Sequence, residues 1–535
     1  MLCAACGQDE DGGADVVPDA GQIQDTGNGE PDVSQDEDAA AQDDAGDLVE
    51  MPMDAEETPD AGVEDVPNPQ DAVDADPDPE PDVNDDASPM VDADEPDMGA
   101  DVQDPPDDVL APIPQDWPQS RGWDWVRSNE TFVSAMATRM GAPPQAAVDR
   151  YYDDFGATAA HLWAAGVPTA SAGWYGARPT RWLAWFNSDG TSAETNTFMG
   201  GPVQDGRLGY QIGDEPRNRA EFEETLASFN TVRAADPEAL LVFNYTYIAD
   251  EIDAFLRESC SNGNVDVFSY DRYTYSNAHY ETIGLFRDAA IACGIPYWRY
   301  MGAIPTNRQL SPSGMRWDAM LGIVYGYTGH TWFVYNISIW EPENIPSIFF
   351  TTPDDWASPT TTWFDVAAQL NQELVVYGQA QRRLRSKTVS YFTPVPIPLV
   401  HPPEGISQWT SGTGQDPYLR AISPVSGAPV QDAALGHYED PYGDTYVVIQ
   451  NPNRVDGSFP NDSDATATFR LELDFGGAPP NVRSDRVIQL GADGVLRALP
   501  VQNGSLNLTI EAGDVIFFKY DTGRPFAGYE ETPLP

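Results

Sequence analysis

The sequence is poor in basic residues and in the residues that most often bind metals. Its 535 residues include four cysteines and five histidines, and no histidines have the spacing of a metal-binding motif. Lys and Arg number 28 against 86 Asp and Glu, a net charge of −58, which argues against nucleic acid as a partner. The sequence contains no phosphate loop, no nucleophile elbow and no apolar run long enough to span a membrane. We therefore expect no metal, no cofactor and no membrane-spanning helix.

The first 120 residues differ in composition from the rest of the chain. They contain 38 Asp and Glu and no Lys or Arg, whereas the remaining 415 residues hold 48 acids and all 28 bases, a net charge of −20. Asp, Ala, Pro and Val recur, as in DAVDADPDPEPDVNDDASP. Because such a segment buries too little apolar surface to offset the entropy of ordering, residues 7–116 are expected to form a disordered linker. Its composition suits a stalk that holds a domain away from a surface, and a solubilising tail is the alternative.

Residues 1–6, MLCAAC, end in a cysteine that follows Ala4 and Ala5, with Leu2 upstream. This resembles the end of a bacterial lipoprotein signal, although Cys3 takes the usual place of a leucine and no basic and apolar segment precedes it. The resemblance implies that Cys6 is lipidated. It also implies an extracellular or outer-membrane location in which the lipid anchor is the only membrane contact. We expect the protein to be a monomer.

The other two cysteines, Cys260 and Cys293, end the helix-like segments ADEIDAFLRESC and ETIGLFRDAAIAC. In a repeating βα fold these two segments would lie side by side, with both ends on one face. A disulfide is therefore predicted in an oxidising compartment, and two unrelated buried thiols are the alternative.

Between residues 117 and 385, short apolar or aromatic runs alternate with longer amphipathic ones, a pattern that predicts alternating strands and helices. The clearest strands are RWLAWFN (181–187), LGYQIGD (208–214), ALLVFNYTY (239–247), VDVFSYDRY (265–273), IPYWRYMGA (295–303) and HTWFVYNI (330–337). The first two strands come from WDWVRSNETFVSAMA and TAAHLWAAG. Eight strands in about 265 residues predict a (β/α)₈ barrel. A doubly wound open sheet is the competitor, but no Gly-rich dinucleotide turn follows an early strand.

The pattern changes in residues 386–535 to strands of period two separated by turns. Examples are DTYVVIQNPN, ATATFRLELDF, DRVIQLGADGVLRALP and SLNLTIEAGDVIFFKYD, with Asp-Gly and Ala-Gly-Asp at the turns. These features predict an antiparallel β-sandwich with no chemistry of its own.

The stretch LGYQIGDEPRNRAEF places Asp214 and Glu215 at the carboxyl end of the fourth predicted strand. In a (β/α)₈ barrel the loops at these ends build the active site. Acids also suit the first turn of a helix, where they face the positive end of its dipole. However, Asn218 and Glu221 have the spacing of a capping box, so the helix is predicted to begin after Asn218. This leaves Glu215 on the loop that faces the barrel mouth.

GYQIGDEP resembles strand four of the (β/α)₈ glycoside hydrolases, especially those of clan A, where an Asn-Glu-Pro or Asp-Glu-Pro carries the acid/base glutamate. The resemblance implies that Glu215 is the general acid in the hydrolysis of a glycosidic bond in a poly- or oligosaccharide. Clan A enzymes also use a glutamate at the end of strand seven as nucleophile, and IPYWRYMGAIP has no carboxylate.

The second carboxylate must therefore come from another strand end, because glycoside hydrolysis normally needs two. Asp271 is preferred, since some other barrel glycosidases resemble this arrangement with carboxylates on strands four and six. A structural ion pair of Asp271 with Arg272 or Arg299 is the alternative interpretation, and Glu341 is the alternative partner. The missing strand-seven glutamate also leaves open a surface carbohydrate-binding protein without turnover.

Several aromatic and polar residues lie near the predicted strand ends and suit sugar binding, since aromatic rings stack on pyranose faces while amides, carboxylates and Arg bind hydroxyl groups. The candidates are Trp163, Trp185, Asn187, Asp214, Asn244, Tyr245, Tyr247, Tyr273, Trp298, Arg299, Trp332, Tyr335 and Asn336.

Overall fold

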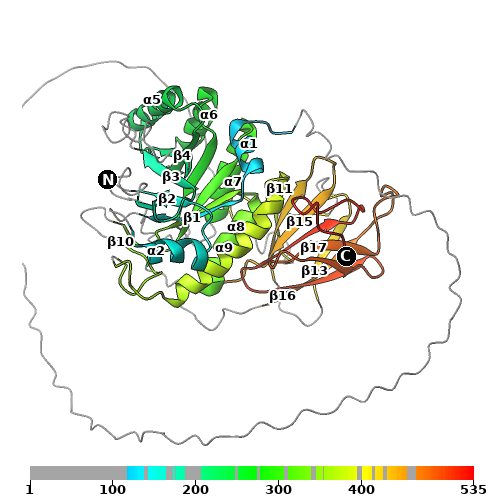
Figure 1. Cartoon of the computed structure of the whole chain (residues 1–535). Helices are drawn as coiled ribbons and strands as arrows, with labels where there is room; N and C mark the ends of the chain where they lie inside the picture. The colour runs from blue at the N-terminus through cyan, green and yellow to red at the C-terminus, as the bar shows by residue number, and fades with distance from the viewer. Residues whose placement is uncertain are drawn as a thin grey trace, which may run out of the picture. The chain divides into compact units, whose positions relative to one another are not determined.

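The computed structural model contains a closed parallel barrel followed by antiparallel sheets (Figure 1). It describes residues 117–137, 143–163, 173–174, 176–186, 206–246, 251–273, 278–305, 311–338, 345–353, 355–394, 401–411, 416–425, 431–454 and 466–535. The predicted lipidation site Cys6 and the predicted linker 7–116 lie outside the described residues.

The barrel confirms the predicted (β/α)₈ fold. Its described strands pair in sequence order, and the barrel closes where Ala135 of the first strand pairs with Trp332 of the last. The strands are β1 (Phe132–Ala137), β2 (Ala160–Leu162), β3 (Trp182–Phe186), β4 (Arg207–Ile212), β5 (Leu240–Thr246), β6 (Val267–Asp271), β7 (Tyr297–Gly302) and β8 (Gly329–Phe333). Most of their positions are buried, because helices or the barrel interior cover both faces of the sheet.

Residues 123–128 of the predicted first strand, WDWVRSNETFVSAMA, are instead helical and precede β1, because Ser120 caps a helix there. The other described helices follow strands, as the amphipathic pattern predicts. The bounds of the helices are α1 (Arg121–Ser128), α2 (Gln145–Asp149), a π-helical turn (Arg150–Asp154), α5 (Arg219–Ala235), α6 (Ile252–Asn262), α7 (Ala278–Cys293), α8 (Pro312–Tyr325) and α9 (Thr362–Gln381). A short hairpin of β9 (Ile337–Ser338) and β10 (Ile345–Pro346) follows β8. No helix in the described ranges is long and apolar enough to cross a membrane.

A disulfide joins Cys260 of α6 to Cys293 of α7, with 5.4 Å between the Cα atoms. Both cysteines lie near the carboxyl ends of their helices, as expected for consecutive βα units. The bond therefore links two neighbouring units on the outside of the barrel.

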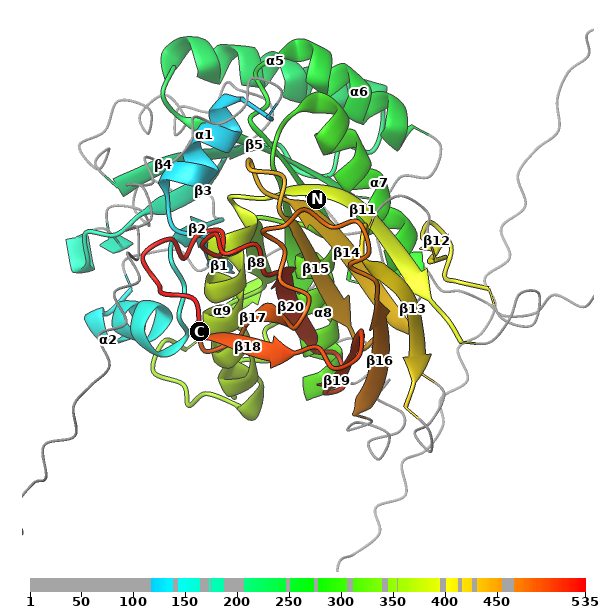
Figure 2. The same ribbon diagram turned by 90° about the vertical axis from the view of Figure 1, so that its right-hand side faces the viewer.

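The C-terminal region forms the predicted β-sandwich (Figure 2). In the described part of the chain, a seven-stranded sheet has the order β12-β11-β14-β15-β20-β17-β18 and a three-stranded sheet the order β13-β16-β19. The strands are β11 (Arg385–Phe392), β12 (Ser407–Gln408), β13 (Leu419–Pro424), β14 (Ala433–Glu439), β15 (Thr445–Gln450), β16 (Ala467–Leu473), β17 (Arg486–Leu490), β18 (Leu496–Pro500), β19 (Ser505–Ile510) and β20 (Val515–Tyr520). Apolar residues that alternate along these strands form the core between the two sheets.

The barrel and the sandwich belong to one compact unit, because the larger sheet packs on barrel helices. Tyr438 of β14 donates a hydrogen bond to the carbonyl oxygen of Val324 in α8 at 2.6 Å. Gln450 of β15 donates to the carbonyl oxygen of Trp317 in the same helix at 3.0 Å. Helix α8 is accordingly buried at nearly every position, which explains its weak amphipathic pattern.

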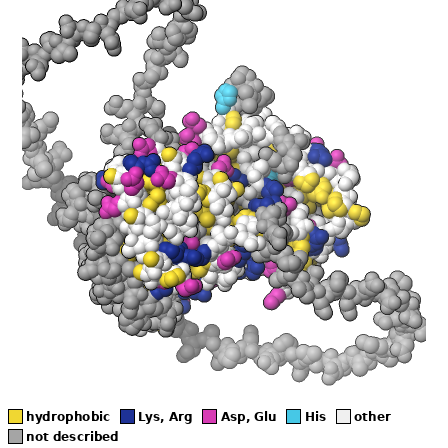
Figure 3. Space-filling model, turned by 90° about the horizontal axis from the view of Figure 1, so that it is seen from above, with side chains coloured by type: hydrophobic (Ala, Val, Ile, Leu, Met, Phe, Trp, Pro, Cys, Tyr) yellow, Lys and Arg dark blue, Asp and Glu magenta, His cyan; other side chains and the backbone are white. Residues whose placement is uncertain are grey.

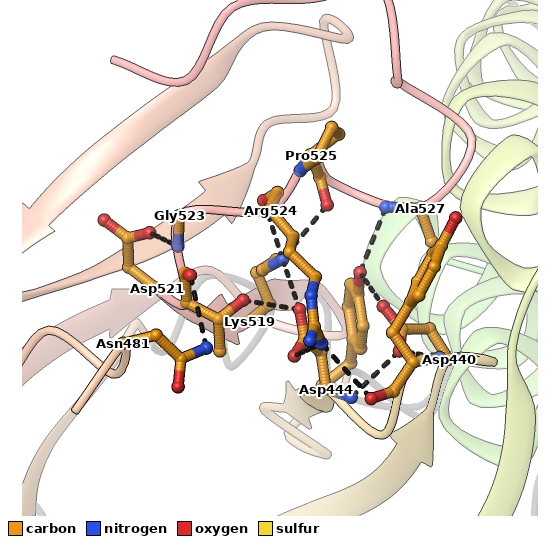
Figure 4. Close-up of polar contacts among 12 residues, drawn as sticks. Asp440, Asp444, Asn481, Lys519, Asp521, Gly523, Arg524, Pro525 and Ala527 are labelled. Carbon is orange, nitrogen blue, oxygen red and sulfur yellow. Dashed lines mark hydrogen bonds and ion pairs between the residues drawn. The ribbon is translucent and has the colours of Figure 1, made fainter. Parts of the chain in front are cut away.

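A buried lysine connects β20 to the C-terminal segment (Figure 4). The Nζ atom of Lys519 donates hydrogen bonds to Oδ2 of Asp444 at 3.0 Å and to the carbonyl oxygens of Arg524 at 2.9 Å and Pro525 at 3.0 Å. Arg524 also pairs with Asp444 at 3.0 Å. Three acceptors thus match the three protons of the ammonium group, and a carboxylate matches its charge.

The face shown in Figure 3 carries Lys and Arg interspersed with Asp and Glu over the described part of the surface. Among the described residues, no group of three or more His, Cys, Asp and Glu could hold a metal ion.

Candidate active site

The carboxyl ends of the barrel strands carry a cluster of large apolar side chains. Because all eight strands run in the same direction, these ends meet at one face of the barrel, the mouth. Trp163 and Trp185 stack there with ring centroids 4.9 Å apart, and Tyr273 stacks on Phe333 at 5.1 Å. The cluster consists of Met136, Trp163, Tyr300, Ile304, Phe333 and Val334, with Trp185 and Tyr273 against it.

The turn after β4 places Glu215 at this mouth. Helix α5 begins at Arg219, and the side chain of Asn218 accepts hydrogen bonds from the amides of Ala220 and Glu221, both at 3.1 Å. This confirms that the helix starts after Asn218, so Glu215 lies on the strand-to-helix turn. Its amide donates to the carbonyl oxygen of Asn244 on β5 at 3.2 Å.

Two residues of this turn adopt left-handed backbone conformations. Gly213 has φ 67°, and a Cβ atom at that position would lie 2.8 Å from the Thr225 side chain. Glu215 has φ 44°, which is uncommon for a residue with a side chain and costs on the order of 1–3 kcal/mol. Strained backbone of this kind concentrates at functional sites, where it fixes a side chain in a required direction.

Three carboxyl groups meet beside this turn, and we refer to Asp214, Glu215 and Asp271 as the acidic cluster. The side chains of Glu215 and Asp271 form a hydrogen bond with each other. The Nδ2 atom of Asn244 bridges Oδ1 of Asp214 at 3.0 Å and Oδ2 of Asp271 at 3.1 Å. The hydroxyl group of Tyr273 also reaches Oδ2 of Asp271, at 3.4 Å. The cluster thus joins the ends of β4 and β6 through the intervening strand β5.

Burial raises the pKa values of both Glu215 and Asp271, and a neighbouring carboxyl group raises each further, Asp271 for Glu215 and Asp214 for Asp271. Burial, followed by the nearby Asp271, raises the pKa of Glu215 to about 11. Burial also raises the pKa of Asp271 to about 7, while the hydrogen bonds from Glu215 and Asn244 lower it. Two carboxyl groups in contact cannot both ionise easily, so the pair holds at least one proton at neutral pH.

This shared proton predicts that the folded protein loses stability as pH rises. The folded-state pKa of Glu215 lies above its ordinary value of 4.5, so above that pH the folded state binds more protons than the unfolded state. Asp271 adds to the effect between its ordinary pKa of 3.8 and about 7. The free energy of unfolding is expected to fall by up to about 1.4 kcal/mol per pH unit for each extra proton, as measured by denaturant midpoints between about pH 5 and 8.

Glu215→Gln is expected to flatten this pH dependence, because the variant side chain has no proton to lose. Glu221→Gln is the matched control, since hydrogen bonds from Arg217 lower the pKa of Glu221. A lowered pKa contributes stability that is lost only as pH falls toward that pKa. The control should therefore keep the parent chain's slope of unfolding free energy against pH between about pH 5 and 8. An unchanged slope in Glu215→Gln would contradict the shared proton.

A second hydrogen-bonded chain leads from the acidic cluster into the barrel. The Nε2 atom of Gln211 on β4 donates a hydrogen bond to Oδ1 of Asp214 at 3.5 Å. The Oε1 atom of Gln211 accepts one from the hydroxyl group of Tyr300 at 2.7 Å. The Tyr300 hydroxyl group is also 3.4 Å from the ring nitrogens of His161. Gln211 is not among the site residues predicted from the sequence, although a polar side chain inside an apolar strand, two positions before Gly213, was an available signal.

Among the predicted sugar-binding residues, five lie at the mouth: Trp163, Trp185, Asp214, Asn244 and Tyr273. Asn336 is buried after β8, where its carbonyl oxygen accepts a hydrogen bond from the amide of Ser347 at 2.8 Å. The predicted sugar contacts Asn187 and Tyr247 and the alternative carboxylate Glu341 lie outside the described residues.

Tyr245 and Arg299 point away from the barrel axis into the helix layer, which corrects their prediction as sugar contacts. Tyr245 contacts the hydroxyl group of Ser259 on α6. Arg299 forms an ion pair with Asp318 of α8. Strand side chains alternate between the interior and the helices, and both positions are buried in a barrel, so burial alone does not separate them.

Trp332, Tyr335 and Trp298 need the same correction. The Nε1 atom of Trp332 donates to Asn371 on α9 at 2.8 Å, and Tyr335 packs against Tyr151 with ring centroids 4.8 Å apart. Trp298 stacks on Phe132 at 4.3 Å, at the amino end of the barrel. These three aromatic rings contribute to packing away from the mouth.

The Arg299–Asp318 pair also bears on the alternative interpretation of Asp271. Arg299 donates to both the carbonyl oxygen and the carboxylate of Asp318, and Arg272 donates to the hydroxyl group of Thr282. Asp271 instead contacts Glu215, Asn244 and Tyr273.

The chain resembles several solved structures at low sequence identity. No protein-family model and no curated protein matches the chain. Similar solved structures include a GH30 endoxylanase from Clostridium papyrosolvens, 11% identical with a TM-score of 0.38, covering 74% of this chain and 97% of that chain. A glycoside hydrolase family 5 protein from Bacteroides vulgatus is 11% identical with a TM-score of 0.45, covering 76% and 92%. A 4-O-α-L-rhamnosyl-β-D-glucuronidase from Fusarium oxysporum is 10% identical with a TM-score of 0.40, covering 75% and 98%.

These structural neighbours are glycoside hydrolases. At such identities and scores the likeness carries no argument about activity, and a barrel fold hosts many unrelated activities. The chemistry of this chain must therefore be argued from its own acidic cluster.

Proposed function

We propose that this protein is a glycoside hydrolase whose reaction centre is the Glu215–Asp271 pair. The observation that carries the proposal is the position of this pair at the carboxyl ends of β4 and β6, at the same barrel mouth as Trp163 and Trp185. Aromatic rings of this kind suit the C–H faces of a sugar, and two carboxyl groups are what glycosidic hydrolysis needs.

The two pKa values support a division of roles. Glu215 has the higher pKa and is the protonated group, so it donates its proton to the glycosidic oxygen as the C1–O bond breaks. Asp271 has the lower pKa and supplies the carboxylate. It either removes a proton from the water that attacks C1 or attacks C1 itself. In the second case water later cleaves the ester, with Glu215 as the base.

The pair must open for this reaction. Two carboxyl groups in hydrogen-bonding contact are closer than the roughly 5–5.5 Å of retaining enzymes or the 6.5–9.5 Å of inverting enzymes. The substrate therefore has to displace the Glu215 side chain from Asp271. The same contact is the observation that favours a second candidate function, a carbohydrate-binding protein in which the pair never opens.

A screen of poly- and oligosaccharides with the purified full chain separates the two functions. We expect new reducing ends from at least one substrate with the parent chain, and loss of this product with Glu215→Gln. Product release at equal rates from both chains would contradict the role of Glu215. Binding of a saccharide with no product would favour the carbohydrate-binding function.

We also propose that the protein acts outside the cytoplasm, anchored through Cys6. The Cys260–Cys293 disulfide supports an oxidising compartment, and the lipoprotein-like residues 1–6 support the anchor. Incorporation of a labelled fatty acid into the parent chain, and its loss in Cys6→Ser, is the expected result. Equal labelling of both chains would contradict the proposed anchor.

A further inference from the structure

Strand β7 carries no carboxylate, and Tyr300 is the residue of this strand that belongs to the apolar cluster at the mouth. Its hydroxyl group contacts two buried polar side chains, Gln211 of β4 and His161 of β2. Strands β2, β4 and β7 are not neighbours in the barrel, so these side chains meet across its interior. Gln211 then links them to Asp214 of the acidic cluster.

These hydrogen bonds fix which end of the Gln211 amide faces the acidic cluster. An amide side chain has an acceptor oxygen at one end and a donor NH₂ group at the other. The Tyr300 hydroxyl group donates to Oε1 of Gln211 at 2.7 Å, so Nε2 is the atom that donates to Oδ1 of Asp214 at 3.5 Å. If the amide turned over, its oxygen would face Asp214 and could accept a hydrogen bond only from a protonated carboxyl group. The orientation of the amide is therefore coupled to the protonation of Asp214.

His161 supports the donating direction of the Tyr300 hydroxyl group. Both ring nitrogens of His161 lie 3.4 Å from the hydroxyl oxygen. Burial lowers the pKa of His161 to about 3, so at neutral pH the ring is neutral and has a single N–H donor. Because Tyr300 uses its one proton at the shorter contact with Gln211, His161 can contact the hydroxyl oxygen only as a donor. The donors thus run in one direction, from His161 through Tyr300 and Gln211 to the acidic cluster.

A second amide donates to the same oxygen atom of Asp214. The Nδ2 atom of Asn244 lies 3.0 Å from Oδ1, so the NH₂ groups of Asn244 and Gln211 converge on this oxygen. Burial and the neighbouring Glu215 raise the pKa of Asp214 well above its ordinary value, while the hydrogen bond from Asn244 lowers it. When Asp214 is protonated, its proton therefore lies on Oδ2, because Oδ1 faces two N–H donors.

We propose that Tyr300 is a positioning residue of the acidic cluster, which acts through Gln211 by keeping the NH₂ end of that amide toward Asp214. The hydroxyl group thereby keeps Oδ1 of Asp214 an acceptor and leaves Oδ2 as the atom that gains or loses the proton. This role goes beyond the proposed function, because it concerns the acidic cluster with or without a substrate. A hydroxyl group that only completes a hydrogen bond inside the barrel would have no effect on protonation.

The carboxyl groups are the route by which pH can enter this arrangement. Burial raises the pKa of Tyr300 well above its ordinary value and lowers that of His161, so neither side chain changes charge between about pH 6 and 9. Arg217 lies near Glu215, but its guanidinium group pairs with Glu221. A pH-dependent effect of Tyr300 in this range must therefore pass through the acidic cluster. The other titratable and charged groups around the cluster are Arg217, Tyr273, Tyr300 and His161.

Tyr300→Phe, made in the full chain, removes the hydroxyl group and frees the Gln211 amide to turn its oxygen toward protonated Asp214. That contact raises the pKa of Asp214 further, and a group with a raised folded-state pKa costs stability as pH rises. We expect the downward shift of the denaturant midpoint caused by Tyr300→Phe to be about twice as large at about pH 9 as at about pH 6. Equal shifts at the two pH values would overturn the proposal.

Tyr297→Phe is the matched control, because it makes the same substitution three residues earlier on β7. Tyr297 is equally buried, and its hydroxyl group donates to the carbonyl oxygen of Tyr325 at the end of α8 at 2.9 Å. The control loses one buried hydrogen bond in the helix layer, so its midpoint shift should be the same at both pH values. A shift that grows with pH equally in both variants would overturn the specific role of Tyr300.

Gln211→Met tests whether Tyr300 acts through the amide, because methionine is of similar length and has no amide group. In this background Tyr300→Phe should shift the denaturant midpoint by the same amount at about pH 6 and 9, since the group that transmits the effect is absent. A shift that still grows with pH would show that Tyr300 reaches the carboxyl groups without Gln211, and it would overturn the proposed route.

The failures of the two proposals are distinguishable, because the unfolding measurements need no substrate. A pH-dependent midpoint shift in Tyr300→Phe, with no product from any saccharide, would remove the hydrolase and keep the positioning role. Product from the parent chain together with a pH-independent shift would keep the hydrolase and overturn the positioning role.

Discussion

Glu215→Gln and Asp271→Asn, made singly, are each expected to lower kcat by about 10²–10⁴-fold on the substrate that the screen identifies. Each change removes one member of a pair that shares a proton, and either loss leaves the other group without its partner in the reaction. Because the two groups act as a unit, the double variant is expected to be only slightly slower than the slower single variant. Steady-state rates of the three variants and the parent chain measure this non-additivity.

Glu221→Gln is the control for this series. It makes the same chemical change six residues further along, in the first turn of α5, where Glu221 pairs with Arg217 outside the acidic cluster. Its kcat should stay close to that of the parent chain. Independent effects that multiply in the double variant would show that Glu215 and Asp271 act separately and would contradict a shared reaction centre.

The barrel could be predicted from the sequence because short apolar runs, typical of buried strands, alternate with longer segments whose apolar residues have the three-to-four-residue spacing of a helix. The start of α5 was also predictable, since Asn218 and Glu221 have the spacing of a cap and the cap forms. Because α5 begins after Asn218, Glu215 could be placed on the strand-to-helix loop at the mouth. These predictions succeeded because they depend on local chain chemistry and on a topology that places all strand ends at one face.

The contacts within the site could not be predicted in the same way. Strands β4 and β6 are not neighbours, and Asn244 on the intervening β5 bridges Asp214 and Asp271. The left-handed backbone of Glu215 has no signature in the residue type. Such tertiary features depend on register and backbone direction.

The sequence also did not reveal which strand side chains point into the barrel and which point toward the helices. Tyr245 and Asn244 are adjacent on β5, yet Asn244 reaches the acidic cluster and Tyr245 reaches Ser259 in the helix layer. Both are buried and both can bind sugars, so the apolar pattern of the strand does not distinguish them. Trp298 differs again, because its place near the start of β7 puts it at the amino end of the barrel.

Lys519→Met is expected to lower the free energy of unfolding by about 3–5 kcal/mol, the usual cost of removing one partner of a buried ion pair. The variant leaves Asp444, which is 4% exposed, with the half-exposed Arg524 as its remaining ion-pair partner. It also leaves the carbonyl oxygens of Arg524 and Pro525 without the donor that Lys519 supplies. The measurement is the shift of the denaturant midpoint at constant slope.

Lys387→Met is the matched control, because it makes the same substitution in the same sandwich at the surface. Lys387 pairs with Glu439 at 2.9 Å, but 44% of its side chain is exposed, so its loss should cost about 0–1 kcal/mol. Adding Asp444→Asn to Lys519→Met should recover part of the lost stability, since the second change removes the carboxylate that was left buried. Equal effects of Lys519→Met and Lys387→Met would mean that the buried network adds no more stability than a surface pair. The difference between the two losses of unfolding free energy therefore measures how much more a buried Lys–carboxylate pair stabilises the fold than an exposed one.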